Sequence, residues 1–183
     1  MKNMGLETFA RQGSQQENFV VRQATAMDLS EIVSLDRTVW DDPETSDGTH
    51  AWRLWIDYAL VFVARDNEKL VGVLLAFPAM RRPDMYLLHK LFVEKDAENR
   101  GIAKTLIQRL FKALNQFYPP GGDKKTQTFS IRLTVSPEND TAKKLYRRWG
   151  FCELWTEPDY YGHGETRTIM EWFVEDSPPM EPF

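Results

Sequence analysis

Apolar side chains recur along this chain with two spacings, and each spacing predicts a type of secondary structure. A spacing of three or four residues, typical of one face of a helix, begins after Thr25 and again near Arg100. Thr25 and Asp28 have the relative positions of a helix N-cap and the third helical residue, so we expect the first helix to start there. A shorter helix is predicted over Ala51–Tyr58, and a further one follows Asn139.

The strands are predicted from apolar runs and from strict alternation. Leu60–Arg65 and Leu70–Pro78 are apolar runs joined by four polar residues, which is the pattern of a β-hairpin. Apolar and polar residues alternate over Phe129–Val135, which predicts a strand with one polar face. The other predicted strands are Phe19–Gln23, Tyr86–Val93, Phe151–Trp155 and Thr166–Val174.

The predicted order is strand, two helices, three strands, helix, strand, helix and two strands. Such an order is typical of an α/β (α+β) domain in which helices cover both faces of a mixed sheet. Because the chain shows no repeat, we expect one domain over residues 19–174. Residues 1–18, which are polar and rich in glutamine, and residues 175–183 are predicted to be tails.

Composition narrows the class of protein. The chain has 183 residues, of which 42% are hydrophobic, enough for a globular core. No apolar run approaches the roughly 18 residues of a membrane helix, and the start lacks a signal-peptide core, so we expect a cytoplasmic protein. The net charge of −4 argues against general nucleic-acid binding. The single cysteine, Cys152, is predicted to be a buried structural thiol, and no Cys/His spacing indicates a metal site.

The most informative segment for chemistry is Glu98–Ala103, which joins the strand Tyr86–Val93 to a predicted helix. Free amides at the start of a helix attract anions, and Gly101 has no side chain to keep a phosphate away. The two commonest phosphate-binding glycine patterns, GxGxxG and GxxxxGK[ST], are both absent. A single turn of this kind is usually structural, so a second feature has to support an anion site.

That second feature is the pattern N-x-x-A-x-x-x-Y-x-x-x-G-F between Asn139 and Phe151. The two segments together resemble the GNAT superfamily of acyl-CoA-dependent N-acyltransferases, in which a Q/R-x-x-G-x-G/A loop precedes such a helix. The resemblance implies a mixed, mostly antiparallel sheet of six or seven strands with helices on both faces. Glu98 departs from the family pattern, because Gln or Arg usually stands there and a carboxylate mildly repels a diphosphate.

The resemblance also implies acetyl-CoA (coenzyme A) as co-substrate and a set of residues that hold it. Backbone groups of Leu91 and Val93 would pair with the pantetheine arm, and a backbone amide near Phe92 would hold the oxyanion. Asn139 would bond the same arm, although an ordinary helix N-cap is an alternative role. The implied cofactor-binding set is Leu91, Phe92, Val93, Glu98, Asn99, Arg100, Gly101, Ile102, Ala103, Asn139 and Tyr146.

Tyr146 and His89 are the first candidates for proton transfer. Tyr146 matches the general acid of the family, and a phenol stays protonated at neutral pH until it meets the leaving thiolate. Its structural alternative is a tyrosine in the apolar face of the helix. His89 is the candidate base because histidine titrates near neutrality, with a satisfied histidine in the sheet as the alternative. His163 and Glu165, on a glycine-flanked loop, are rival bases.

An aromatic and acidic region follows the first predicted helix. Its members are Trp40, Trp52, Trp55 and Tyr58, together with Asp41, Asp42 and Glu44. In the family, the first two helices and the final hairpin usually wall the acceptor pocket, and such a wall would suit a cationic amine. Amphipathic packing beside a charged loop is the alternative.

We therefore expect an N-acetyltransferase that moves an acetyl group from acetyl-CoA to a primary amine by direct attack in a ternary complex. The acceptor would be a small-molecule or peptide amine, and similar proteins are often homodimers. Two alternatives stay open. One is a non-catalytic acyl-CoA-binding regulatory module on the same scaffold, and the other is an unrelated α/β interaction protein.

Overall fold

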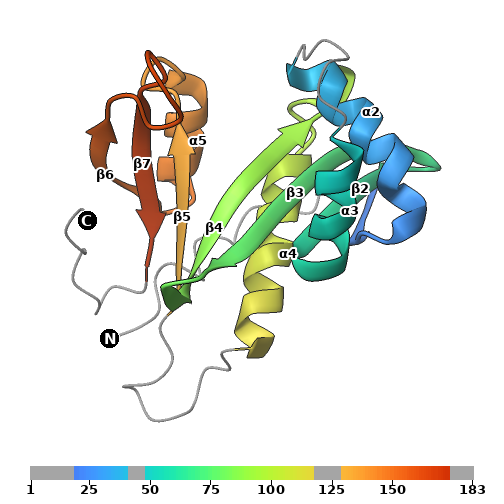
Figure 1. The fold of residues 1–183 in the computed structure, drawn as a ribbon. Helices are drawn as coiled ribbons and strands as arrows, with labels where there is room; N and C mark the ends of the chain where they lie inside the picture. Colours follow the sequence, from blue (N-terminus) through green and yellow to red (C-terminus); the bar gives the residue numbers. More distant parts are fainter. Residues whose placement is uncertain (1–18, 41–47, 118–128, 174–183) are drawn as a thin grey trace. The chain divides into compact units, whose positions relative to one another are not determined.

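A computed structural model describes residues 19–40, 48–117 and 129–173 of the chain (Figure 1). Within these ranges the chain forms four α-helices and one seven-stranded sheet with the order β1-β2-β3-β4-β5-β7-β6. The pairs β1/β2, β2/β3, β5/β7 and β6/β7 are antiparallel, and β4/β5 is parallel. This architecture confirms the predicted mixed, mostly antiparallel sheet. None of the described helices is both long and apolar enough to cross a lipid bilayer.

The predicted elements are all present. The strands are β1 (Phe19–Gln23), β2 (Leu60–Asp66), β3 (Lys69–Ala79), β4 (Arg82–Val93), β5 (Ser130–Val135), β6 (Cys152–Glu157) and β7 (Arg167–Trp172). The helices are α2 (Leu29–Trp40), α3 (Thr49–Tyr58), α4 (Ile102–Phe117) and α5 (Asp140–Arg148), with 3₁₀ turns η1 (Ala26–Asp28) and η2 (Lys95–Ala97). Strand β4 begins four residues earlier than predicted. The predicted tails lie outside the described residues, and the single-domain prediction stays a prediction.

The described residues divide into two compact units that share β4. The first unit contains residues 19–40, 48–77 and 88–117, and the second contains residues 78–87 and 129–173. The pairing of β4 with β5 runs from Met85 to Leu87, inside the second unit.

In the first unit, helices cover both faces of the sheet (Figure 1). Val61 and Val63 of β2 belong to the core that α2 and α3 complete with Ile32 and Trp52. Their neighbour Phe62 lies on the α4 side, where the Arg109 guanidinium is 5.6 Å from its ring centroid. Because both faces are covered, β2 and β3 are continuous apolar runs and do not alternate.

The first residue of helix α4 packs against Gly72 of the sheet. A Cβ added to Gly72 of β3 would be 2.9 Å from Cγ2 of Ile102, so only glycine leaves room for the helix start. The predicted apolar stripe of this helix is buried, from Ile102 through Leu106 and Leu110 to Leu114. Burial of this stripe positions the amino terminus of α4 on the sheet.

The second unit corrects the prediction of a polar face on β5. Ser130 and Arg132 are both buried, at 6% and 9% exposure. Arg132 is tolerated there because its guanidinium lies 2.7 Å from the Glu171 carboxylate of β7 and 5.2 Å from the Trp155 ring centroid. A charge can be buried when a partner of opposite sign satisfies it.

The prediction for Cys152 is also wrong, because this residue is exposed. It begins β6, which is the outermost strand next to β7, and most residues of that strand are exposed. An edge strand has a neighbouring strand on one side only, so more of its surface is exposed. The position of Cys152 in a predicted strand was therefore not enough to predict its burial.

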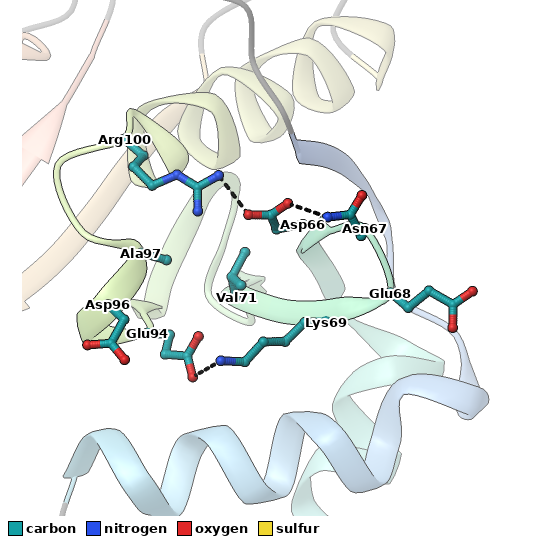
Figure 2. A pocket seen from close by; sticks show the side chains of 9 residues that line it. All are labelled: Asp66, Asn67, Glu68, Lys69, Val71, Glu94, Asp96, Ala97 and Arg100. Atoms are coloured by element: carbon teal, nitrogen blue, oxygen red, sulfur yellow. Dashed lines mark hydrogen bonds and ion pairs between the residues drawn. The ribbon is translucent and has the colours of Figure 1, made fainter.

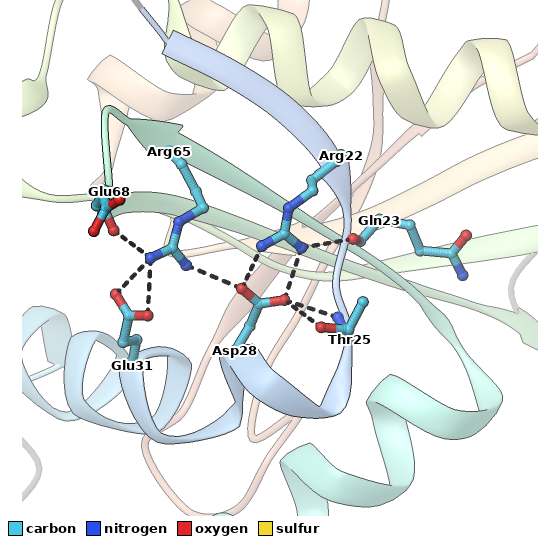
Figure 3. A network of polar contacts seen from close by, with 7 residues as sticks. All are labelled: Arg22, Gln23, Thr25, Asp28, Glu31, Arg65 and Glu68. Carbon is cyan, nitrogen blue, oxygen red and sulfur yellow. Dashed lines mark hydrogen bonds and ion pairs between the residues drawn. The ribbon is translucent and has the colours of Figure 1, made fainter.

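A buried carboxylate ties β1, β2 and the start of α2 together. Asp28 is 1% exposed and accepts hydrogen bonds from Arg22 Nη1 at 2.8 Å, Arg65 Nη1 at 3.0 Å and the Thr25 amide at 2.8 Å (Figure 3). The bond from Thr25 confirms the predicted helix cap. Arg65 also bonds Glu31 at 2.9 Å and the Glu68 carbonyl. The bonds from Arg22 are the main cause that lowers the pKa of Asp28 from 3.8 to about 2.

We predict that Asp28→Asn lowers the free energy of unfolding at pH 7 by about 3 kcal/mol, because two guanidinium groups lose their shared anion. The folded-state pKa is the lower one, so the contribution is present above about pH 4 and is lost as the pH falls toward 2. This pH-dependent part of the free energy of unfolding amounts to about 2 kcal/mol. Urea unfolding at pH 7, 4 and 3 measures both effects.

The matched control is Asp57→Asn, which removes an exposed carboxylate from the Arg53–Asp57 pair on α3. This change should cost less than about 0.5 kcal/mol. Equal losses for the two variants would contradict the role assigned to Asp28.

Candidate active site

The turn between β4 and α4 has the backbone shape of an anion cradle. After η2, Asn99 has φ of 60° and Gly101 has φ of 84°, so both adopt the left-handed conformation. Turns that mix right- and left-handed residues point successive amides toward one side. A Cβ added to Gly101 would meet nothing within 4 Å. The backbone conformation therefore favours glycine, and the space beside it is open to a ligand.

The first amides of α4 add to this cradle. The Thr105 amide donates to the Gly101 carbonyl at 3.0 Å, which is the first backbone bond of the helix. By the geometry of any α-helix, the amides of the first turn lack an acceptor within the helix and carry a partial positive charge. The Glu98 side chain is exposed, so solvent weakens the repulsion that this carboxylate would exert on an anion.

The side chain of Arg100 is paired with a carboxylate. Its guanidinium lies 2.7 Å from Asp66, at the end of β2, and the Lys69 ammonium lies 2.6 Å from Glu94 (Figure 2). These pairs border a cavity of about 420 Å³. The cavity is lined by Asp66, Asn67, Glu68, Lys69, Val71, Glu94, Asp96, Ala97 and Arg100. Because its carboxylates outnumber its cations, this cavity does not suit an anion, and the backbone amides remain the better donors.

His89 of β4 lies among aromatic rings. Its ring centroid is 5.6 Å from those of Trp55 on α3 and Phe77 on β3, although the residue as a whole is exposed. Partial burial lowers the pKa of His89, the charge of Lys90 lowers it further, and Asp36 opposes both. His89 is therefore neutral at pH 7 and able to accept a proton.

The structure divides the predicted aromatic and acidic region. Trp52 is fully buried, whereas Trp40 and Tyr58 are 58% and 82% exposed. Trp55 lies between His89 and Trp52, whose ring centroid is 5.0 Å away. The predicted acidic members Asp41, Asp42 and Glu44 lie outside the described residues.

Sequence reasoning missed the two charged residues at the centre of this region. Lys90 Nζ lies 2.7 and 2.8 Å from the two carboxylate oxygens of Asp36. The indole nitrogen of Trp52 donates to the same carboxylate at 2.7 Å. The available signal was the position of Asp36, four residues after the buried Ile32, on the apolar face of α2.

In the second unit, Asn139 precedes α5 as its N-cap and Tyr146 lies on this helix. Asn139 Oδ1 accepts from the Ala142 amide at 3.0 Å, which confirms its alternative role as N-cap. The Tyr146 ring lies 5.8 Å from Trp149 and 5.6 Å from Phe151, measured between centroids. Burial raises the pKa of Tyr146 to about 12, so its phenol keeps its proton at any physiological pH. These contacts fit both a packing role and a proton donor.

The candidate residues thus fall into two groups. The first unit contains His89, Leu91, Phe92, Val93 and the turn 98–103, with Phe92 buried and Leu91 and Val93 half-buried. The second unit carries Asn139 and Tyr146, together with the rival bases on the loop before β7. Both rivals are exposed, and Glu165 is paired with Arg167 at 2.6 Å.

Comparison with known sequences gives two likenesses. The sequence model of the acetyltransferase (GNAT) family matches residues 28–151. The chain is also similar to L-2,4-diaminobutyric acid acetyltransferase of Marinococcus halophilus, at 22% identity over 133 residues. That alignment covers 63% of this chain and 72% of the relative.

Solved structures show the same fold. The ribosomal-protein-S18-alanine N-acetyltransferase of Escherichia coli superposes with a TM-score of 0.69 at 20% identity, over 90% of this chain and 99% of that one. Arabidopsis thaliana NAA60, in complex with a bisubstrate analogue, gives a TM-score of 0.71 at 17% identity, over 87% and 99%. At these identities the likeness supports the fold alone.

We predict that the His89 imidazole titrates below its usual pKa of 6.5, because neighbouring rings limit its hydration. Trp55→Ala should raise the midpoint toward 6.5 by returning water to the ring. NMR spectra of the imidazole carbons against pH measure it, with His89→Gln to assign the signal. Trp155→Ala, in the second unit, is the control and should leave the midpoint unchanged. A wild-type midpoint at or above 6.5 would refute the assignment.

Proposed function

This chain belongs to the acetyltransferase (GNAT) family, and from that membership we propose that it transfers the acetyl group of acetyl-CoA to a primary amine. The observation that carries the proposal is the turn before α4. There Asn99 and Gly101 have left-handed backbones, and a Cβ at Gly101 would meet nothing within 4 Å. Both observations support a diphosphate site at the first amides of the helix. Acetyl-CoA would supply the acyl group, and its pyrophosphate would lie against the amides of residues 98–103.

Two further sets of residues are proposed to hold the cofactor. Leu91 and Val93 come after the stretch of β4 that pairs with β5, which supports a role for their backbone groups in pairing with the pantetheine arm. Asn139 would bond the same arm through its amide nitrogen, since its oxygen already caps α5.

The reaction we propose is direct attack within a ternary complex. The amine must first lose a proton, which neutral His89 accepts directly or through a water molecule. The nitrogen lone pair attacks the thioester carbon, and a backbone amide near Phe92 stabilises the oxyanion. When the C–S bond breaks, the Tyr146 phenol would give its proton to the thiolate, and the second proton that the attacking nitrogen must lose would return to the phenolate through water.

The acceptor would be a small-molecule or peptide amine. The names of two relatives support this range, because one acetylates L-2,4-diaminobutyric acid and the other an alanine of ribosomal protein S18. Incubation with acetyl-CoA and a panel of such amines, analysed by mass spectrometry, tests the proposal. Tight binding of coenzyme A without turnover on any amine would favour a regulatory acyl-CoA-binding module.

We predict that Gly101→Ala weakens coenzyme A binding at least tenfold. The new methyl group would extend into the open space beside the turn, and a non-glycine residue at φ of 84° would distort the amides. The matched control is Gly164→Ala, which has φ of 85° and open surroundings but lies on the loop before β7. Calorimetric titration with coenzyme A should separate the two variants. Equal losses of affinity would count against the cradle.

We predict that Tyr146→Phe lowers kcat about 100-fold, because the leaving thiolate loses its proton donor. The affinity for coenzyme A should change little, and a thermal melt will establish that the variant folds. The measurement is steady-state transfer to the best amine of the panel between pH 7 and 9. An unchanged maximal rate across this range would remove Tyr146 as the acid.

A further inference from the structure

Four side chains from three elements of the first unit form what we call the Lys90 cluster: Asp36 and Trp40 of α2, Trp52 of α3 and Lys90 of β4. The Asp36 carboxylate accepts from Lys90 Nζ at 2.7 and 2.8 Å and from the Trp52 indole at 2.7 Å. The Lys90 ammonium is also 5.8 Å from the Trp40 ring centroid and 5.7 Å from that of Trp52. The Asp36 and Lys90 side chains are only 15% and 22% exposed.

A carboxylate beside two indole rings is the chemistry that recognises an ammonium ion. In this chain Lys90 supplies that ammonium itself. The sequence suggested that the aromatic region would attract a cationic acceptor. Within the described residues, Lys90 neutralises Asp36 and lies near both rings. The acidic residues on which the expectation rested, Asp41, Asp42 and Glu44, lie outside the described residues, so that expectation stays a prediction.

The cluster adjoins the proposed reaction centre. Trp55 contacts both His89 and Trp52, with ring centroids 5.6 and 5.0 Å away. The charges of Lys90 and Asp36 both influence the His89 imidazole, in opposite directions. A second ammonium group on an acceptor held at His89 would therefore meet aromatic rings and a carboxylate that is already paired.

We propose that Lys90 is a specificity-determining residue: it fills the cation site formed by Asp36, Trp40 and Trp52, and thereby selects monoamine acceptors over diamines. This inference rests on the proposed function, since it places the reacting amine at His89. A second ammonium group would have to lose water without gaining an anionic partner, and it would be repelled by Lys90. A neutral or apolar group in the same place bears neither cost.

The test compares butylamine with 1,4-diaminobutane, which differ only in the second amino group. Wild-type protein should use butylamine at least tenfold better, by kcat/KM. Lys90→Ala should raise the diamine-to-monoamine ratio at least tenfold, because the second ammonium group can then bind Asp36. The double variant Asp36→Asn/Lys90→Ala should lose that gain. Arg53→Ala, which removes the cation of an exposed pair on the same α3, should leave the ratio unchanged.

A second readout does not depend on turnover. Propylammonium should raise the melting temperature of Lys90→Ala by several degrees by replacing the missing ammonium, and 1-propanol should not. The rescue should be absent in wild type and in the double variant. If Lys90→Ala fails to fold, Lys90→Met retains the side-chain length and should still improve use of the diamine by removing the repulsion.

The outcomes separate the two proposals. Equal use of both amines by wild type, or an unchanged ratio in Lys90→Ala, overturns the role of Lys90 and leaves the acetyltransferase proposal in place. Failure of every variant to acetylate any amine overturns the proposed function and, with it, the selectivity. If no amine is acetylated, stabilisation of Lys90→Ala by propylammonium still identifies a cation site at Asp36. Absence of that stabilisation would refute the cation site.

Discussion

The close approach of α4 to the sheet is the constraint on which the candidate site depends. Ile102 begins the helix directly against Gly72, where a larger residue would force one of the two side chains to shift. The chain must therefore turn sharply between η2 and the helix, and Asn99 and Gly101 make that turn with left-handed backbones. Packing in the core thus decides where the first amides of α4 lie, and the chemistry of the turn follows from this packing.

Paired charges explain why backbone amides are the best hydrogen-bond donors to an anion in this region. Arg100, the basic residue closest to the turn, is bonded to Asp66 of the β2 end. Charges are paired elsewhere in the first unit as well, where Asp28 binds two arginines and Asp36 binds Lys90. Buried and half-buried charges that already have partners hold elements together but offer little to a ligand, whereas amides at a helix start remain available.

The proposed chemistry uses two groups whose surroundings move their pKa values in opposite directions. Burial raises the pKa of Tyr146 to about 12 and lowers that of His89, so both are neutral near pH 7. A neutral phenol can give a proton to a thiolate and a neutral imidazole can take one from an ammonium. The pairing of Lys90 with Asp36 beside His89 is the observation from which the proposed choice of acceptor follows.

The sequence by itself determined the elements, their order, the apolar stripe of α4, the caps at Thr25 and Asn139 and the family, because periodicity, capping and short motifs are local properties. The burial of Arg132, the exposure of Cys152 and the pairing of Lys90 with Asp36 were decided only by tertiary structure. The last pair is separated by 54 residues, and Arg132 needs Glu171, 39 residues away. From sequence alone a charged residue is predicted to be exposed, because the partner that allows its burial is distant in the chain. A cysteine is predicted to be buried, because the sequence does not show that its strand lies at the edge of the sheet.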